Sequence, residues 1–239
     1  MKRFWITASV ERAGDAYQVL LDGRPVRLPG GTPLSVPTAL LGTAIAEEWQ
    51  AAGTQPGGEV SWDMVPLTRL AGTAQERIAP DPDAVADALA KYGESDLLCY
   101  RAARPEELVR RQDRAWQPWL DWAAQHYSAR LVPTTGIMHR PQDPEALAAL
   151  RRALGEQDAL TLAALGVAVP ALGSLVLGLA LAAGALDSGM AHALATLDET
   201  YQADQWGEDA DAARRRERIG EDVAVAGRLM RLAHGLLDG

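Results

Sequence analysis

The chain has 239 residues, of which 48% are hydrophobic and 23% are charged, a composition typical of a globular protein with one or two domains. Its net charge of −9 argues against nucleic acid as the main partner. Cys99 is the single cysteine, so a disulfide framework is excluded and a reducing compartment is expected. Charges at Glu11 and Arg12 follow too soon for a signal-peptide core. With no transit peptide or low-complexity tail apparent, we expect a complete bacterial cytoplasmic protein.

The first 79 residues have the pattern of a small β-rich domain. The dipeptide Asp22-Gly23 between two apolar runs is a strong hairpin signal. Further turn residues follow at Pro29-Gly30-Gly31. Four strands are predicted, at residues 4–10, 17–21, 26–28 and 34–36.

An amphipathic helix is predicted after this sheet. Pro37-Thr38 is typical of a helix start, and Gly53 is expected to end the helix. Leu41, Ile45 and Trp49 are at helical spacing, so we expect the Trp49 indole to pack between the helix and the sheet. An extended segment and a short helix are predicted next, at residues 62–66 and 67–78.

From residue 80 onward the whole sequence has a helical pattern, and the Pro/Asp-rich "APDPDAV" marks a domain boundary. The predicted helices are 83–92, 105–128 with a break at Pro118, 144–154, a hairpin over 159–183, 189–206 and 210–237. The last helix has one apolar face, made by Ile219, Val223, Ala226, Met230, Ala233 and Leu237. We therefore predict an α+β protein, with a β-rich domain of one or two helices at 1–79 and an all-α domain at 80–239.

Residues 159–186 form a run of 28 residues without a charged side chain, whereas about 20 suffice for a transmembrane helix. Pro170 and the N-cap candidate Ser174 divide this run into two predicted helices, 159–169 and 175–183. A helix of 11 residues is about 16 Å long, against a hydrocarbon core of about 30 Å. The flanking residues are acidic, and a basic anchor is missing at both ends. The pattern favours the buried centre of a helical domain, with a membrane span as the alternative.

A search for catalytic or ligand-binding motifs finds none that specifies a reaction. Ser174 lies in "LGSLV", which is not a nucleophile elbow, and is expected to cap a helix. "PGGTP" lacks the lysine of a phosphate loop. Cys99 is expected to be a buried, inert thiol. We therefore predict neither a catalytic residue, a cofactor nor a metal. The histidines lack metal-ligand spacing: His126, His139, His192 and His234.

Two aromatic-rich segments stand out. Trp116, Trp119 and Trp122 fall within seven residues. Aromatic residues at this spacing are usually core, and the alternative is that one of them is exposed for a partner.

The second segment is "LDETYQADQW", residues 197–206. On a helical wheel, Glu199, Gln202 and Trp206 share a face whose carboxylate, amide and indole suit a recognition strip. The alternative is a solvated face with one buried tryptophan. The other face is apolar and is expected to face the core: Leu194, Leu197 and Tyr201.

A set of segments in a fixed order resembles the ATP synthase assembly chaperones that hold the free α subunit of the F(1) catalytic head. The segments are "FWITASVE", "YQVLLDGRPVRLP", "PLSVPTALLGTAIAEEWQ", "MVPLTRLAGTA", "YGESDLLCYRA", "LVRRQDRAWQPWLDW", "GSLVLGLAL" and "LDETYQADQWG". The resemblance covers nearly the whole chain. It implies a soluble protein that is not an enzyme, with a β-rich N-terminal and a helical C-terminal domain. It also implies that the protein binds the unassembled α subunit, prevents its aggregation and gives way to the β subunit.

The resemblance further implies that an acidic residue near the Trp-Gly pair binds the α subunit. Glu199 is the first candidate and Glu208 the second, and the segment after Trp206-Gly207 departs from the family pattern, which leaves both open. The predicted partner-binding residues are therefore Glu199, Gln202, Trp206 and Glu208. We expect a free monomer that binds neither nucleic acid nor a cofactor. The alternatives are a small membrane-associated helical protein and an enzyme with a cryptic site.

Overall fold

The computed structural model describes residues 1–136 and 138–236 and is an α+β structure, as the sequence predicts. The chain forms two compact units, each described here by itself. The first unit consists of residues 1–81, 158–164 and 228–236, and the second of the described residues within 82–157 and 165–227. The domain boundary after residue 79 stays a prediction.

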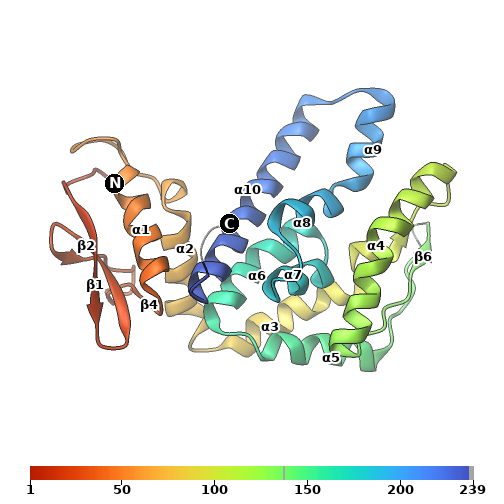
Figure 1. Ribbon diagram of the computed structural model, residues 1–239, viewed down its shortest axis with the longest axis horizontal. Helices are drawn as coiled ribbons and strands as arrows, with labels where there is room; N and C mark the ends of the chain where they lie inside the picture. Colours follow the sequence, from red (N-terminus) through yellow and green to blue (C-terminus); the bar gives the residue numbers. More distant parts are fainter. Residues whose placement is uncertain (137, 237–239) are drawn as a thin grey trace. The chain divides into compact units, whose positions relative to one another are not determined.

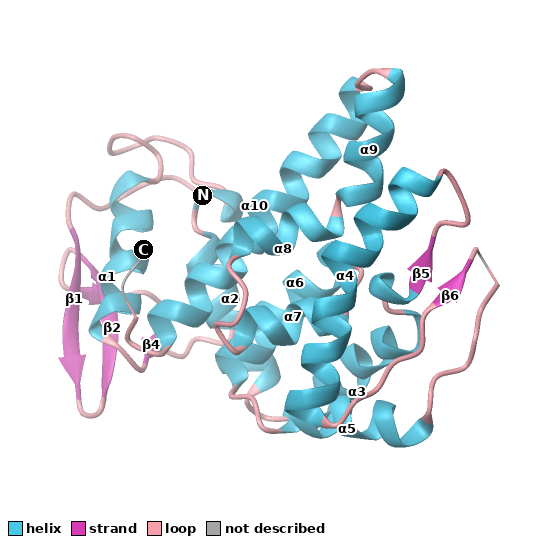
Figure 2. Cartoon of the chain, turned by 45° about the vertical axis from the view of Figure 1, so that its right-hand side comes forward, coloured by secondary structure: helices cyan, strands magenta, loops and turns pink. Residues whose placement is uncertain are grey.

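The first unit contains an antiparallel sheet in the order β1-β2-β3, with β4 also paired to β2 (Figure 2). Asp22 and Gly23 have φ values of 47° and 76°, as expected for a hairpin turn between β2 and β3. Leu20 and Leu21 at the end of β2 are buried in the core of this unit. The strands are β1 (Ala8–Ala13), β2 (Ala16–Leu21), β3 (Arg24–Pro25) and β4 (Ser35–Val36).

Two strand predictions differ from the structure by more than one residue at a boundary. The strand predicted at 4–10 begins only at Ala8, because side chains bind the preceding backbone. The Asp22 carboxylate accepts hydrogen bonds from the Ile6 and Thr7 amides, at 3.1 and 2.9 Å. The strand predicted at 26–28 is also displaced, since β3 ends at Pro25.

Helix α1 (Ala39–Ala51) begins after Thr38, whose hydroxyl accepts from the Leu41 amide at 3.1 Å. Trp49 is 2% exposed, and its indole lies edge-on to Trp5, with 5.1 Å between ring centroids. Its ring N–H donates to the Thr68 hydroxyl at 2.9 Å. Trp49 is therefore a core residue that joins α1 to α2 (Pro66–Thr73).

The extended segment predicted at 62–66 is wrong. Residues Trp62–Met64 form a 3-10 turn, stabilised by an ion pair between Asp63 and Arg69 at 2.9 Å. Only Val65 before Pro66 stays out of the helical region, because a residue that precedes proline is sterically restricted. Helix α2 then continues into a π-helical turn, Ala74–Ile78.

The rest of the chain is mostly helical (Figure 1). The α-helices are α3 (Pro82–Ala90), α4 (Glu106–Tyr127), α5 (Pro144–Gly155), α6 (Ala159–Leu172), α7 (Leu175–Ala182), α8 (Ser188–Ala195), α9 (Leu197–Trp206) and α10 (Ala210–Ala233). Two 3-10 turns, Lys91–Ser95 and Leu97–Cys99, follow α3. Strands β5 (Tyr100–Arg101) and β6 (Thr134–Thr135) form a short parallel pair.

The helix break predicted at Pro118 is also wrong, because α4 is continuous from Glu106 to Tyr127. Pro118 and Arg114, whose carbonyl loses its helical hydrogen bond, are both exposed. Water can satisfy that carbonyl, so the proline is accommodated on the outer face of the helix.

The apolar run forms two helices, as predicted, but the first extends through Pro170 to Leu172. Pro170 and Gly166, four residues earlier, are both exposed, so the ring meets only solvated backbone. Ser174 caps α7 as predicted, accepting from the Leu177 amide at 3.1 Å. Throughout residues 1–136 and 138–236, no helix is long and apolar enough to cross a bilayer.

The helix predicted at 189–206 is two helices. Thr196, with φ −101° and ψ 11°, separates α8 from α9, and its hydroxyl donates to the His192 carbonyl at 2.8 Å. In α10 the predicted apolar face is buried at Val223, Ala226, Met230 and Ala233, while Ile219 is half-buried. Leu237, predicted on the same face, lies outside the described residues.

Candidate partner-binding surface

Helix α9 carries three of the four predicted partner-binding residues, and α4 fixes its beginning. The Gln112 side-chain amide of α4 donates to both carboxylate oxygens of Asp198, at 2.8 and 3.0 Å. Burial raises the pKa of Asp198, while the Gln112 bond opposes that shift. One turn along α4, the fully buried Trp116 donates its ring N–H to the Leu194 carbonyl at 2.9 Å. The start of α9 is therefore anchored to a rigid core element.

Arg111 of α4 holds the middle of α9. Its guanidinium lies 5.2 Å from the centroid of the Tyr201 ring, which is 6% exposed. The same guanidinium is 3.6 Å from the Asp204 carboxylate. Tyr201 therefore belongs to the inward face, as the wheel predicts, and the opposite face of α9 is left outward.

Glu199 is half-buried and paired with α10. Its Oε1 accepts from the Arg215 guanidinium at 2.6 Å, and its side chain is 35% exposed. Its Oε2 is buried and has no hydrogen-bond partner among the described residues. Glu199 is therefore an ion-pair partner within the chain as well as a partly exposed surface residue.

Trp206 is the most exposed large apolar side chain in the described part of the chain, at 78%. It ends α9, and Gly207 with φ 91° turns the backbone away from the helix. Gln202, one turn earlier, is exposed and has no hydrogen-bond partner among the described side chains. Since Glu199, Gln202 and Trp206 are spaced three and four residues apart on one helix, they share its outward face. We call these three residues the α9 face.

Glu208 is separated from the α9 face. It follows the helix, and its carboxylate accepts from the Arg216 guanidinium of α10 at 2.5 Å. The Arg216 side chain is only 13% exposed, and its backbone carbonyl lies 2.8 Å from His192 Nε2. Glu208 therefore links the α9–α10 connection to α10 through this ion pair, and its side chain is 62% exposed.

Sequence reasoning missed the arginines that organise this surface. Arg111, Arg215 and Arg216 each contact a carboxylate on α9 or directly after it. The run "RRRER" in α10 was a visible signal of such pairing. Which acid Arg215 and Arg216 contact depends on the antiparallel arrangement of α9 and α10, and the Arg111 contact depends on the packing of α4 against α9. A pattern along one helix predicts neither arrangement.

The tryptophan cluster of α4 faces inward or is half-covered. Trp116 is fully buried, and Trp119 and Trp122 are half-buried. Trp122 stacks on His126 with 4.8 Å between ring centroids. The core interpretation is therefore confirmed for Trp116, and the aromatic contacts of Trp119 and Trp122 are with rings of their own helix.

The residues considered for catalysis lie in structural roles. Cys99 is buried, as expected, and burial, with a smaller contribution from Asp96, raises the pKa of its thiol to about 12. A thiol held protonated is a poor nucleophile. Within the described ranges, His, Cys, Asp and Glu side chains form no group of three that could hold a metal ion.

Comparisons with known proteins agree with this architecture. Residues 2–124 match the family model described as "ATP12 chaperone protein". The chain is 25% identical over 222 residues to "Protein atp12, mitochondrial" of Schizosaccharomyces pombe, which covers 88% of this chain and 75% of that protein. The crystal structure of Atp12 from Paracoccus denitrificans matches with a TM-score of 0.90 and 43% identity, over 97% of this chain and 98% of that chain. An aspartate-to-lysine mutant of Paracoccus denitrificans Atp12p matches with a TM-score of 0.90 and 42% identity, over 97% of both chains.

Proposed function

Because the chain belongs to the ATP12 chaperone family and is thus a chaperone for ATP synthase assembly, we propose that its client is the free α subunit of the F(1) catalytic head. In this proposal the chaperone binds the α subunit before assembly, prevents its aggregation and releases it to the β subunit. It acts without catalysing a reaction, as a monomer when free, in the bacterial cytoplasm or its equivalent, the mitochondrial matrix.

A physical argument supports a holding function. A subunit destined for a ring exposes large, partly apolar interfaces before assembly, and such patches associate wrongly. A chaperone has to cover the patch and still release it. A small hot spot with a charged residue that sets the register serves this purpose better than a wholly apolar surface.

The exposure of Trp206 is the observation that supports the α9 face as the binding surface. Tryptophan is enriched at interface hot spots, because its large flat ring gains much from burial against a partner. Here the indole is 78% exposed on a helix that α4 and α10 hold in place. A preorganised surface of this kind loses little conformational entropy on binding.

Capture of tagged subunits tests the choice of client. We expect the wild-type protein to co-purify with co-expressed α subunit and not with β subunit. We expect Trp206→Ala to weaken α capture about 30-fold, the loss typical of a hot-spot tryptophan. Trp62→Ala is a matched control, since Trp62 is 51% exposed but lies in the other unit. Equal capture of α and β would overturn the proposed client.

Glu199→Lys is expected to abolish α capture. Because Glu199 pairs with Arg215, reversal also opposes two cations, so we expect a small fall in melting temperature, in keeping with a partly exposed ion pair worth at most about 1 kcal/mol. The charge-swapped double variant Glu199→Lys/Arg215→Glu separates the two effects. It re-forms the ion pair and should recover the melting temperature but not α capture. If the double variant captures α fully, Glu199 acts only through the packing of α9, and Glu208→Lys becomes the next variant.

The purified protein is expected neither to bind nor to hydrolyse ATP. The glycine-rich segment at 29–33 lacks a phosphate-loop lysine, and Gly31, with φ 87°, lies in a turn whose amide donates to the Leu28 carbonyl at 2.8 Å. Titration calorimetry with ATP and Mg²⁺ checks this expectation. Stoichiometric micromolar binding would favour the enzyme alternative.

A further inference from the structure

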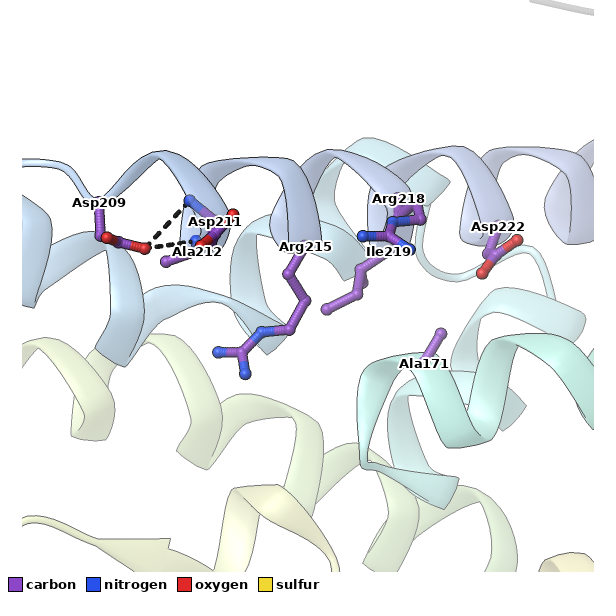
Figure 3. A pocket seen from close by; sticks show the side chains of 8 residues that line it. All are labelled: Ala171, Asp209, Asp211, Ala212, Arg215, Arg218, Ile219 and Asp222. Carbon is purple, nitrogen blue, oxygen red and sulfur yellow. Dashed lines mark hydrogen bonds between the residues drawn. The ribbon is translucent and has the colours of Figure 1, made fainter.

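A groove of about 640 Å³ runs along the first half of α10 in the helical unit (Figure 3). Figure 3 shows Arg215 and Ile219 pointing from α10 into the groove, with Ala171 of α6 across from them. Arg218 and Asp222 line the groove further along the same helix. The groove therefore combines a small apolar centre with charges of both signs.

The charges of the groove are not all matched within the chain. Arg214, Arg215 and Arg216 each contact a carboxylate of the chain, as the ion pairs above and the Arg214–Asp211 pair show. Arg218 is exposed and has no carboxylate partner among the described residues. Asp222, one helix turn away, is exposed and likewise has no cationic partner in the described ranges. Asp209 also lines the groove, but its carboxylate caps α10 by accepting from the Asp211 and Ala212 amides at 3.0 and 2.9 Å. Beyond this cap, the groove presents the Arg218 cation and the Asp222 anion, one helix turn apart, to an incoming ligand.

The apolar stripe of α10 also extends beyond the chain's own packing. Val223 and Ala226 are fully buried, but Ile219 and Ala212, toward the beginning of the same helix, are only half-buried. A helix whose apolar stripe is partly uncovered offers the seam that a second helix uses in helix-in-groove recognition. Ala171, with its short side chain, leaves room for such a segment opposite Ile219.

We propose that this groove binds one amphipathic helix of the client, in continuity with the α9 face. The client helix places a carboxylate on Arg218, a basic side chain on Asp222 one turn away, and an apolar side chain on Ile219. Arg215 lines the groove and pairs with Glu199, so the two surfaces meet at one ion pair. This inference rests on the proposed function, because the client is taken to be the α subunit.

Charge reversal tests the groove. Arg218→Glu is expected to weaken α capture tenfold or more, because it sets two acids against each other. Arg77→Glu makes the same change in charge at an exposed position of the other unit and should leave capture unchanged. Melting curves of both variants show whether the fold is retained. Unchanged capture by a folded Arg218→Glu variant would contradict the proposal.

A photo-crosslinking residue gives a second, independent readout. Placed at position 219 in the groove, p-benzoylphenylalanine should capture the α subunit, whereas at the exposed position 224, on the opposite side of α10, it should not. The crosslinked α peptide should be helical and carry an acid and a base one turn apart. A crosslinked peptide without this pair would contradict the proposed groove interaction, and so would the absence of a crosslink while the wild-type protein still captures α subunit. Neither result would contradict the α subunit as the client. Failure of the wild-type protein to capture α overturns the proposed function itself.

Discussion

Trp49→Arg is expected to lower the free energy of unfolding by about 5 kcal/mol or more, enough to unfold most of the protein at 37 °C. Trp49 is 2% exposed and packs against Trp5 in the core of the first unit. Loss of a buried aromatic side chain costs about 3–5 kcal/mol, and an unpaired buried charge adds several more. The adjacent carboxylate, Glu48, already accepts from the Leu67 and Thr68 amides.

Urea unfolding measures this effect, with Trp62→Arg as the matched control. Trp62 is 51% exposed and lies in the same unit, so its substitution by arginine should change stability by about 0.5 kcal/mol or less. Equal unfolding midpoints for Trp49→Arg and the wild-type protein would show that Trp49 is not a core residue.

Asp96→Ala is expected to produce the second largest loss, about 3–5 kcal/mol at pH 7. Asp96 is fully buried and accepts from the Ser174 hydroxyl at 2.8 Å and from the Val176 and Leu98 amides at 3.0 and 3.1 Å. Two of these donors belong to the first turn of α7 and its cap, so the variant leaves the Val176 amide and the Ser174 hydroxyl without this acceptor. Asp143→Ala, which removes the exposed cap of α5, is the control and should cost about 1 kcal/mol.

The loss caused by Asp96→Ala should depend on pH. Burial raises the pKa of Asp96 from 3.8 to about 6, although its hydrogen bonds oppose the shift. The folded state keeps this proton to higher pH than the unfolded state does. The contribution of Asp96 to the free energy of unfolding is therefore fully present below about pH 4 and is lost as the pH rises through about 6. The destabilisation should therefore be about 1 kcal/mol larger at pH 5 than at pH 7. Urea titrations of both proteins at these two pH values check it, and a loss that grows with pH would contradict the assignment.

The sequence predicts the helices well where a cap or an apolar stripe marks them. Thr38 and Ser174 were identified as helix starts, and both hydroxyls accept the expected amide. The errors concern proline and threonine. The sequence predicts a break at Pro118 and a helix end before Pro170, but a proline on an exposed helix face loses only a solvated hydrogen bond. Thr196 was expected inside a helix, and its buried hydroxyl bonds the preceding turn instead.

The candidate site is predictable from sequence only in part. The helical period groups Glu199, Gln202 and Trp206 on one face, and the structure places all three on α9 with Trp206 exposed. The ion pair between Glu199 and Arg215 joins two helices, and the residue spacing along one helix cannot predict it. For the same reason the groove along α10 was not foreseen. Whether these residues bind the α subunit stays a prediction.

Suppression of α-subunit aggregation by the purified protein tests the central claim most directly. The measurement is light scattering of α subunit diluted from denaturant, with and without the chaperone, followed by addition of β subunit. We predict that one equivalent of the wild-type protein abolishes the scattering, that Trp206→Ala does so only in large excess, and that β subunit then displaces the chaperone from a complex isolated by gel filtration. Scattering of α subunit that is unchanged by the wild-type protein would contradict the account.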